Sequence, residues 1–164
     1  MVAAVAPRCG ATRAVDLALT VQIACPTRGL PARADFEAAA CAALRGRRGC
    51  AELTLRLVDA DEGRALNQRW RGKDYATNVL SFPATGLAAV APELLGDIAL
   101  CAPVIAAEAR AQGKRALDHW RHLTVHGVLH LLGYDHARDA QALVMEAAER
   151  AALASLGVAD PYQA

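Results

Sequence analysis

Aromatic residues are scarce in this sequence of 164 residues, and its charges nearly cancel. Phe, Trp and Tyr together make up 4% of the chain, too few to predict a platform on which nucleic-acid bases could stack. The formal net charge of +1 excludes a general attraction of the whole chain for polyanions. Any phosphate binding must therefore be local, and basic residues do cluster in segments 45–48 and 64–73. Charge alone leaves open whether these clusters bind phosphate or form an ordinary solvated surface.

The sequence also has no apolar run of about 18 residues, so it predicts no membrane-spanning helix. Residues 1–8 lack the basic start and the long apolar stretch of a signal peptide, which argues against secretion. The five cysteines are widely spread and never form a C-x-x-C pair, so the pattern predicts neither a disulfide framework nor a thiolate zinc site. We therefore expect a soluble, cytoplasmic protein without membrane contact.

The length fits one domain with a sizeable core. Residues 1–14 show no hydrophobic periodicity, and we expect a disordered N-terminal extension there, followed by a single domain over 15–164. Alternating or apolar segments predict strands at 15–23, 52–58, 78–82 and 97–101. Helical spacing predicts helices at 36–44, 59–70, 103–112, 114–133 and 139–156. Strands gathered before helices indicate an α+β fold, a small mixed sheet of about four strands packed against about five helices.

Three histidines near the end of the longest predicted helix form the most specific pattern. His126 and His130 are four residues apart, so on a helix both imidazoles face the same point. Gly133 lies where a helix commonly turns into the left-handed conformation, which would bring His136 back to that point. The pattern therefore predicts a metal site, the alternative being a core histidine pair with an unrelated loop histidine.

Three protein ligands, with a fourth position left to water, are typical of a catalytic rather than a structural zinc site. Such a site lowers the pKa of the bound water to about 7. Nickel, copper and iron also accept imidazole ligands, but zinc is the commonest ion with this set. We expect one zinc ion per chain, with His119 and His122, on the same helical stripe, as core residues or partners behind the ligands.

The spacing H-x-x-x-H-x-x-G-x-x-H is also that of the metzincin peptidases. In those enzymes a glutamate follows the first histidine and acts as the general base, whereas Gly127 occupies this position here. Glycine cannot accept a proton, so a metal-dependent peptidase is the less favoured alternative.

The histidine segment 122–136 closely resembles the signature of the YbeY family of bacterial metal-dependent endoribonucleases. Segment 67–83 is similar to the central motif of that family, and 95–98 followed by 108–109 is similar to its third motif. The similarity covers about residues 50–162.

The resemblance implies a zincin-like metal site on a long helix, with His126, His130 and His136 as zinc ligands. It further implies an endoribonuclease specific for single-stranded RNA, which acts in maturation of the 3′ end of 16S ribosomal RNA and in ribosome quality control. The expected partners are ribosomal RNA and the ribosome or ribosomal proteins, with no nucleotide cofactor. A non-catalytic ribosome-associated zinc protein is a further alternative, which requires a fourth ligand, and Asp135 is close enough in sequence to supply one.

Arg71 matches the functionally important arginine of the family. A guanidinium grips phosphate with two parallel hydrogen bonds, so it can stabilise the charge that develops during phosphodiester cleavage. Candidate substrate contacts are Lys73, Asn78, Ser81 and Asp97. Asn78 and Ser81 could instead satisfy local backbone groups, and Asp97 could be a turn or capping carboxylate. No general base is identified, and attack by water or by the RNA 2′-hydroxyl both remain open.

Overall fold

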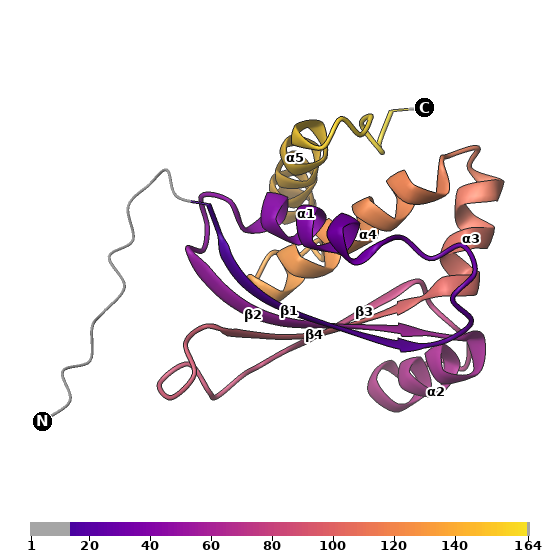
Figure 1. Ribbon diagram of the computed structural model, residues 1–164, viewed down its shortest axis with the longest axis horizontal. Coiled ribbons are helices and arrows are strands. Elements are labelled where there is room, and N and C mark those ends of the chain that lie inside the picture. The colour runs from indigo at the N-terminus through magenta and orange to yellow at the C-terminus, as the bar shows by residue number, and fades with distance from the viewer. Residues whose placement is uncertain (1–13, 164) are drawn as a thin grey trace, which may run out of the picture.

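Helices cover mainly one face of a four-stranded sheet in the computed structural model, which describes residues 14–163 (Figure 1). The strands are β1 (Asp16–Ala24), β2 (Cys50–Val58), β3 (Val79–Pro83) and β4 (Leu94–Cys101). The helices are α1 (Arg33–Leu44), α2 (Ala60–Arg71), α3 (Ala102–Ala111), α4 (Ala116–Leu131) and α5 (Asp139–Ser155). The predicted α+β fold is thus confirmed, while the predicted N-terminal extension lies outside the described residues apart from Ala14.

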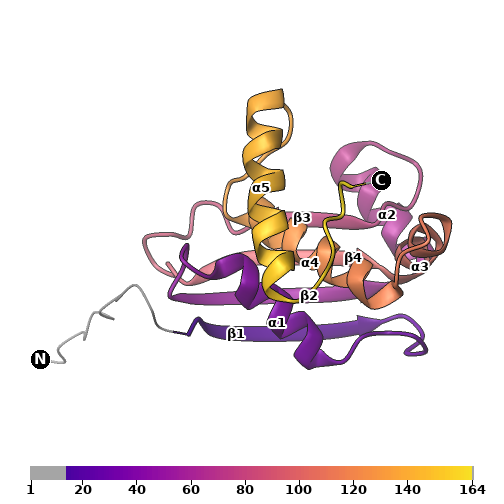
Figure 2. The ribbon, with the colours of Figure 1, turned by 90° about the horizontal axis from the view of Figure 1, so that it is seen from above.

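The strand order is β1-β2-β4-β3. The first three strands of this order are parallel, and β3 pairs antiparallel with β4 at one edge, so the sheet is mixed. Figure 2, viewed from above, shows α1 over β1 and β2 and α5 crossing the sheet. Helix α4 packs on β3 and β4 beside them, whereas α2 lies on the opposite face.

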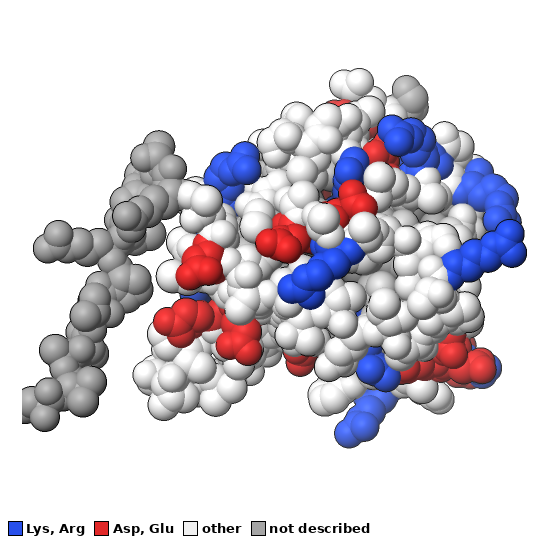
Figure 3. Space-filling view, viewed as in Figure 1, with Lys and Arg blue, Asp and Glu red and all other residues white. Residues whose placement is uncertain are grey.

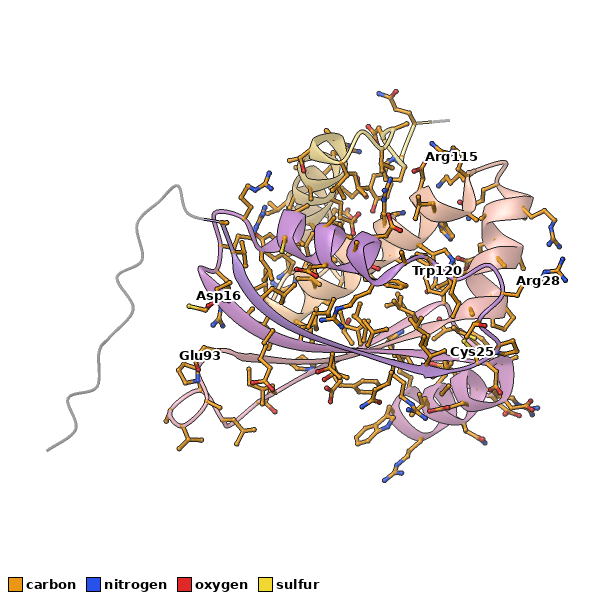
Figure 4. The ribbon with its side chains drawn as sticks, in the orientation of Figure 1. Asp16, Cys25, Arg28, Glu93, Arg115 and Trp120 are labelled. Atoms are coloured by element: carbon orange, nitrogen blue, oxygen red, sulfur yellow. The ribbon has the colours of Figure 1, made fainter. Side chains whose placement is uncertain are left out.

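The core lies between the sheet and α1, α4 and α5. Side chains alternate along β2, so Leu53, Leu55 and Leu57 are buried beneath these helices while Thr54 and Arg56 face the other side. Trp120 of α4, labelled in Figure 4, is 3% exposed and meets the ring of Phe36 edge-on at 5.7 Å. No helix among the described residues is both long and apolar enough to cross a membrane.

Helix α2 begins with a side-chain cap at Asp59. The carboxylate of Asp59 accepts a hydrogen bond from the backbone N–H of Glu62 at 2.9 Å, as in a capping box. The Glu62 carboxylate does not complete the box but pairs with Arg56 of β2, with a shortest N–O distance of 2.6 Å. The Glu62 side chain therefore ties α2 to the sheet.

Gly96 interrupts the regular pairing of β4. It has φ +138°, and a Cβ placed there would lie 2.2 Å from the carbonyl oxygen of Phe82 on β3. The register between β2 and β4 shifts beside it, between Glu52 and Leu53. A bulge of this kind needs a residue without a side chain.

Gly96→Ala should lower the free energy of unfolding by about 3 kcal/mol, since strain and a clash with rigid backbone act together. Gly86→Ala is the matched control, because Gly86 also has positive φ but nothing within 4 Å of its Cβ position. It should lose about 1 kcal/mol. Urea unfolding of both variants measures the difference, and equal losses would contradict this role for Gly96.

Candidate metal centre

The C-terminal end of α4 brings the three predicted histidines together. His126 and His130 lie one turn apart, with their Nε2 atoms 3.1 Å from each other. The helix ends at Leu131, and Gly133, at φ +95°, reverses the chain. The ring of His136 then lies 5.0 Å from that of His130 between centroids, so the predicted turn delivers the third imidazole.

The donor atoms of this trio fit a small cation. One ring nitrogen from each of His126, His130 and His136 lies within 4.8 Å of the other two. Tetrahedral zinc, with bonds of about 2.0–2.1 Å, separates its nitrogen ligands by roughly 3.4 Å, which is close to the separation of the two helical nitrogens. His136 is exposed while the other two are partly buried, so one side of the cluster faces solvent. The donor set and its open side are those of a three-ligand site.

Burial affects the protonation of the central ligand. The pKa of His130 is lowered, first by burial and then by the neighbouring charges of His126 and His136. A lowered pKa keeps the imidazole neutral at pH 7, and only the neutral ring has a lone pair for a metal.

A fully buried carboxylate, Glu149 of α5, stands behind the trio. His126 donates a hydrogen bond to it through Nδ1, and the Tyr162 hydroxyl donates another. Nε2 of His122 lies 3.4 Å from the same carboxylate. Burial by itself would raise the pKa of Glu149, but the hydrogen bonds from His122, His126 and Tyr162 outweigh it and lower the pKa to about 2. The group is therefore a carboxylate at neutral pH.

Sequence reasoning did not identify Glu149, although the sequence carries a signal. Helix α5 buries a stripe that includes Met145, Ala148, Ala152 and Leu153, and Glu149 lies within it. A charged residue inside an apolar stripe has to be paired, and histidines are the partners that α4 presents.

Asn78 belongs to a second carboxylate and histidine pair at the other end of α4. Its amide donates to the Glu108 carboxylate at 3.1 and 3.2 Å, and its own oxygen accepts from the backbone of Val79 at 2.7 Å. Glu108 also contacts Nε2 of the buried His119 at 2.8 Å. Asn78 thus has internal partners, and a substrate contact for it stays a prediction.

Helix α4 is in close contact with the sheet at Gly127, beside Ser81 of β3. The Ser81 hydroxyl donates to the carbonyl of Gly127 at 3.0 Å. A Cβ at Gly127 would lie 3.0 and 3.1 Å from two carbons of Ile98 on β4. A glutamate at this position would point into the sheet rather than toward the histidines, which agrees with the argument against a peptidase.

The other predicted site residues come from the opposite face of the sheet. Arg71 is the exposed last residue of α2, and Lys73 follows the left-handed Gly72 that ends this helix. Trp70 of α2 meets Phe82 of β3 at 5.7 Å between ring centroids. Phe82 and Ser81 are adjacent on a strand, so their side chains point to opposite faces, toward α2 and α4 respectively.

Asp97 also lies on the α2 face, because it pairs with Phe82 across the β3–β4 ladder. It is exposed and lines a groove of about 650 Å³ together with Thr54, Arg56 and Trp70. The structure thus brings the three histidines together and places Asp97, together with the helix that ends at Arg71, on the other face of the sheet. Roles for Arg71, Lys73 and Asp97 stay predictions.

Comparisons with known proteins point to one family. A family model described as "Endoribonuclease YbeY" matches residues 33–157. A Stenotrophomonas maltophilia protein named Endoribonuclease YbeY is 55% identical over 152 residues, covering 90% of this chain and 94% of its own. A protein of the same name from Xanthomonas oryzae is 53% identical over 152 residues, with the same coverage. A Thermotoga maritima protein of known solution structure shares the fold, with TM-score 0.54 and 24% identity over 88% of this chain and 100% of that one.

Purified protein should carry about one zinc ion per chain. His130→Ala should weaken zinc binding by more than roughly 100-fold, because loss of a ligand should cost more than loss of a residue that only hydrogen-bonds to a ligand, which costs up to about 100-fold. Titration against a chromophoric chelator measures the affinity. His119→Gln is the matched control, since His119 lies on the same helix outside the trio, and it should keep the ion. Full zinc retention by His130→Ala would refute the assignment of the site.

The metal-free protein should lose stability as the pH falls from about 4.5 toward 2. Glu149 has a folded pKa of about 2 against an ordinary value of 4.5, so the unfolded chain takes up a proton first as the solution is acidified. Chemical unfolding at several pH values should show a shallower decline for Glu149→Gln than for the wild type. Equal slopes for the wild type and Glu149→Gln would contradict this account.

Proposed function

Because the chain belongs to the YbeY endoribonuclease family, we propose that it is a metal-dependent endoribonuclease whose ion is zinc, held by His126, His130 and His136. The observation that carries this proposal is the convergence of three imidazole nitrogens within 4.8 Å of one another, with one side of the cluster exposed. Zinc at this site would supply Lewis-acid chemistry at a phosphoryl oxygen and a source of hydroxide at neutral pH. We further propose that residues 15–164 act as one domain.

Arg71 and Lys73 are proposed to bind the phosphates of the substrate. A guanidinium neutralises the charge that builds on a phosphate during cleavage, and an ammonium group adds a second, less directional contact. Arg71 and Lys73 lie at the C-terminal end of α2, on the face of the sheet opposite α4, the helix that carries His126 and His130. β3 is the edge strand, with β4 as its one neighbour in the sheet. An RNA strand that crosses this edge would meet both sets of residues.

The substrate that best suits this arrangement is single-stranded RNA. A flexible strand can follow a path over the sheet edge, whereas a rigid duplex cannot bend so sharply. Basic and acidic side chains both occur on the face drawn in Figure 3, so attraction to RNA would come from local contacts. Binding through phosphates is expected to weaken as the salt concentration rises.

The two alternative functions, a metal-dependent peptidase and a non-catalytic zinc protein, each lack a required group. A metzincin-type peptidase needs a glutamate at position 127, where Gly127 packs against the sheet. A structural zinc site needs a fourth ligand, and within residues 14–163 no further His, Cys, Asp or Glu joins the trio. Asp135 instead accepts a hydrogen bond from the backbone of His136 at 2.7 Å.

The biological setting is proposed from the resemblance to the family. We propose that the RNA is ribosomal, that the reaction contributes to maturation of the 3′ end of 16S ribosomal RNA and to ribosome quality control, and that the protein meets the ribosome or its proteins in the cytoplasm. The basis for this setting is the resemblance of the three sequence motifs to those of the family.

Zinc-loaded wild-type protein should cleave a single-stranded RNA, and both chelated protein and His130→Ala should leave it intact. Loss of an ion that polarises the reacting phosphate removes the main source of rate enhancement. Gel analysis of end-labelled RNA measures cleavage. Cleavage that persists in all three preparations would indicate a contaminating ribonuclease and would oppose the proposal.

Arg71→Ala should retain zinc and fold normally but cleave RNA about 100-fold more slowly or worse, since a donor aimed at developing charge is lost. Arg110→Ala is the matched control, because Arg110 also lies in the last turn of an exposed helix, α3. Single-turnover cleavage rates compare the two variants. Equal rates would remove Arg71 from the mechanism.

A further inference from the structure

The chain after α5 folds back over α4 (Figures 1 and 2). One core contact and two hydrogen bonds hold it in place. Val158 is 8% exposed and joins the core. Asp160 accepts a hydrogen bond from Nε of Arg150 at 3.0 Å. The Lys114 ammonium donates to the carbonyl of Pro161 at 3.3 Å. These contacts give the C-terminal segment 158–163 a defined path next to the histidine helix.

This path carries Tyr162 to the buried carboxylate behind the metal centre. The backbone N–H of Tyr162 donates to Asp160 at 2.9 Å, and its ring lies edge-on to His122 with centroids 5.7 Å apart. Its hydroxyl then donates to Oε2 of Glu149. The other carboxylate oxygen, Oε1, accepts the hydrogen bond from Nδ1 of His126.

We propose that Glu149 and Tyr162 are positioning residues of the metal centre, so that the C-terminal segment helps to set its affinity. This inference rests on the proposed function, because it assigns roles relative to the ion. An imidazole that donates its Nδ1–H to a carboxylate is held in one tautomer and one ring orientation, with the Nε2 lone pair left for a metal. Tyr162 fixes the carboxylate in turn, because its hydroxyl occupies the oxygen that His126 does not use.

Two observations support a positioning role over a merely structural one. Glu149 is 0% exposed, although a buried carboxylate is costly unless every oxygen has a donor. Its donors are a proposed metal ligand, a histidine next to that ligand on the helix and the tyrosine of the C-terminal segment. An apolar residue would fill the same space at lower cost, so the carboxylate is best explained by what it does to His126.

A second cation among His122, His126 and Glu149 is the competing interpretation. One donor atom from each of these residues lies within 4.8 Å of the others. However, both oxygens of Glu149 are in direct hydrogen-bond contact with an N–H or an O–H, which leaves no space for an ion between the groups. A hydrogen-bonded carboxylate therefore accounts for the geometry, and two tightly bound zinc ions per chain would overturn the proposal.

Tyr162→Phe tests the proposal at a residue that is 41% exposed, so the variant should fold. Chelator competition should show that zinc affinity is reduced by about tenfold. This is the lower end of the loss seen when a residue that supports a metal ligand through hydrogen bonds is removed. Tyr75→Phe is the matched control, because Tyr75 is exposed and lies outside the metal centre, and its affinity should equal that of the wild type. Affinities that agree within twofold among the three proteins would overturn the role of Tyr162.

Glu149→Gln should weaken zinc binding by about 10- to 100-fold. Nitrogen NMR of the histidine rings in metal-free protein gives a second readout, which a purely structural role would not change. His126 should carry its proton on Nδ1 in the wild type and populate both tautomers in Glu149→Gln. A wild-type ring protonated on Nε2, or an unchanged tautomer in the variant, would overturn the proposal.

The two readouts separate failure of this inference from failure of the proposed function. A wild-type protein that binds no zinc would refute the metal-dependent nuclease, while the tautomer of His126 would still report on Glu149. Asp160→Asn provides a second test. Asp160 accepts the hydrogen bond from the Tyr162 backbone, so this substitution should change zinc affinity only by changing the position of Tyr162. The double variant Asp160→Asn, Tyr162→Phe should then bind zinc as weakly as the weaker single variant. Additive losses would overturn the route through the C-terminal segment.

Discussion

The close approach of α4 to the sheet at Gly127 determines the rotation of this helix about its axis, and so which side chains face solvent and which face α3 and α5. With no side chain there, the helix backbone comes near enough to β3 and β4 for Ser81 to bond the Gly127 carbonyl and for Ile98 to fill the space. Successive helical residues are rotated by about 100°, so turning position 127 to the sheet turns His126 and His130 to the side of the helix. The rotation of α4, and with it the direction of the ligands, is therefore set by packing rather than by the metal.

The same rotation buries His119 and partly buries His122, so their polar atoms need partners within the protein. Glu108 reaches His119 at one end of α4, and Glu149 reaches His122 and His126 further along. Each carboxylate comes from a different helix, so one polar contact joins α3 to α4 and a second joins α5 to α4. The link through Glu149 is specific, because a small displacement of α5 would leave a fully buried charge without a donor. Ligand geometry at the solvent end of α4 thus depends on how α5 packs.

Much of this arrangement could be predicted from local sequence patterns, and the parts that could not depend on long-range pairing. Periodicity predicted the helices and strands, and the spacing of His126, Gly133 and His136 predicted the convergence of the trio. The family resemblance is confirmed by the matches, and the role that it implies for Arg71 stays a prediction. Glu149 was missed because nothing local pairs it with His126, 23 residues away. Ser81 and Asp97 were both predicted to face substrate. Their faces depend on the β3–β4 register, in which Asp97 pairs with Phe82; a shift of one residue would have put both on the same side.

That register also explains why an edge strand separates the two proposed halves of the site. A pocket for a small molecule encloses its ligand, so its functional groups line one cavity. An endonuclease acts within a long chain, and the substrate must enter and leave on both sides of the bond that is cut. An edge strand with the histidine helix on one face and the helix of Arg71 on the other leaves such a path open, since within residues 14–163 no further strand pairs with β3. Under the proposed function, Arg71 and the histidines need no contact with each other, because an RNA backbone that crosses this edge would connect them.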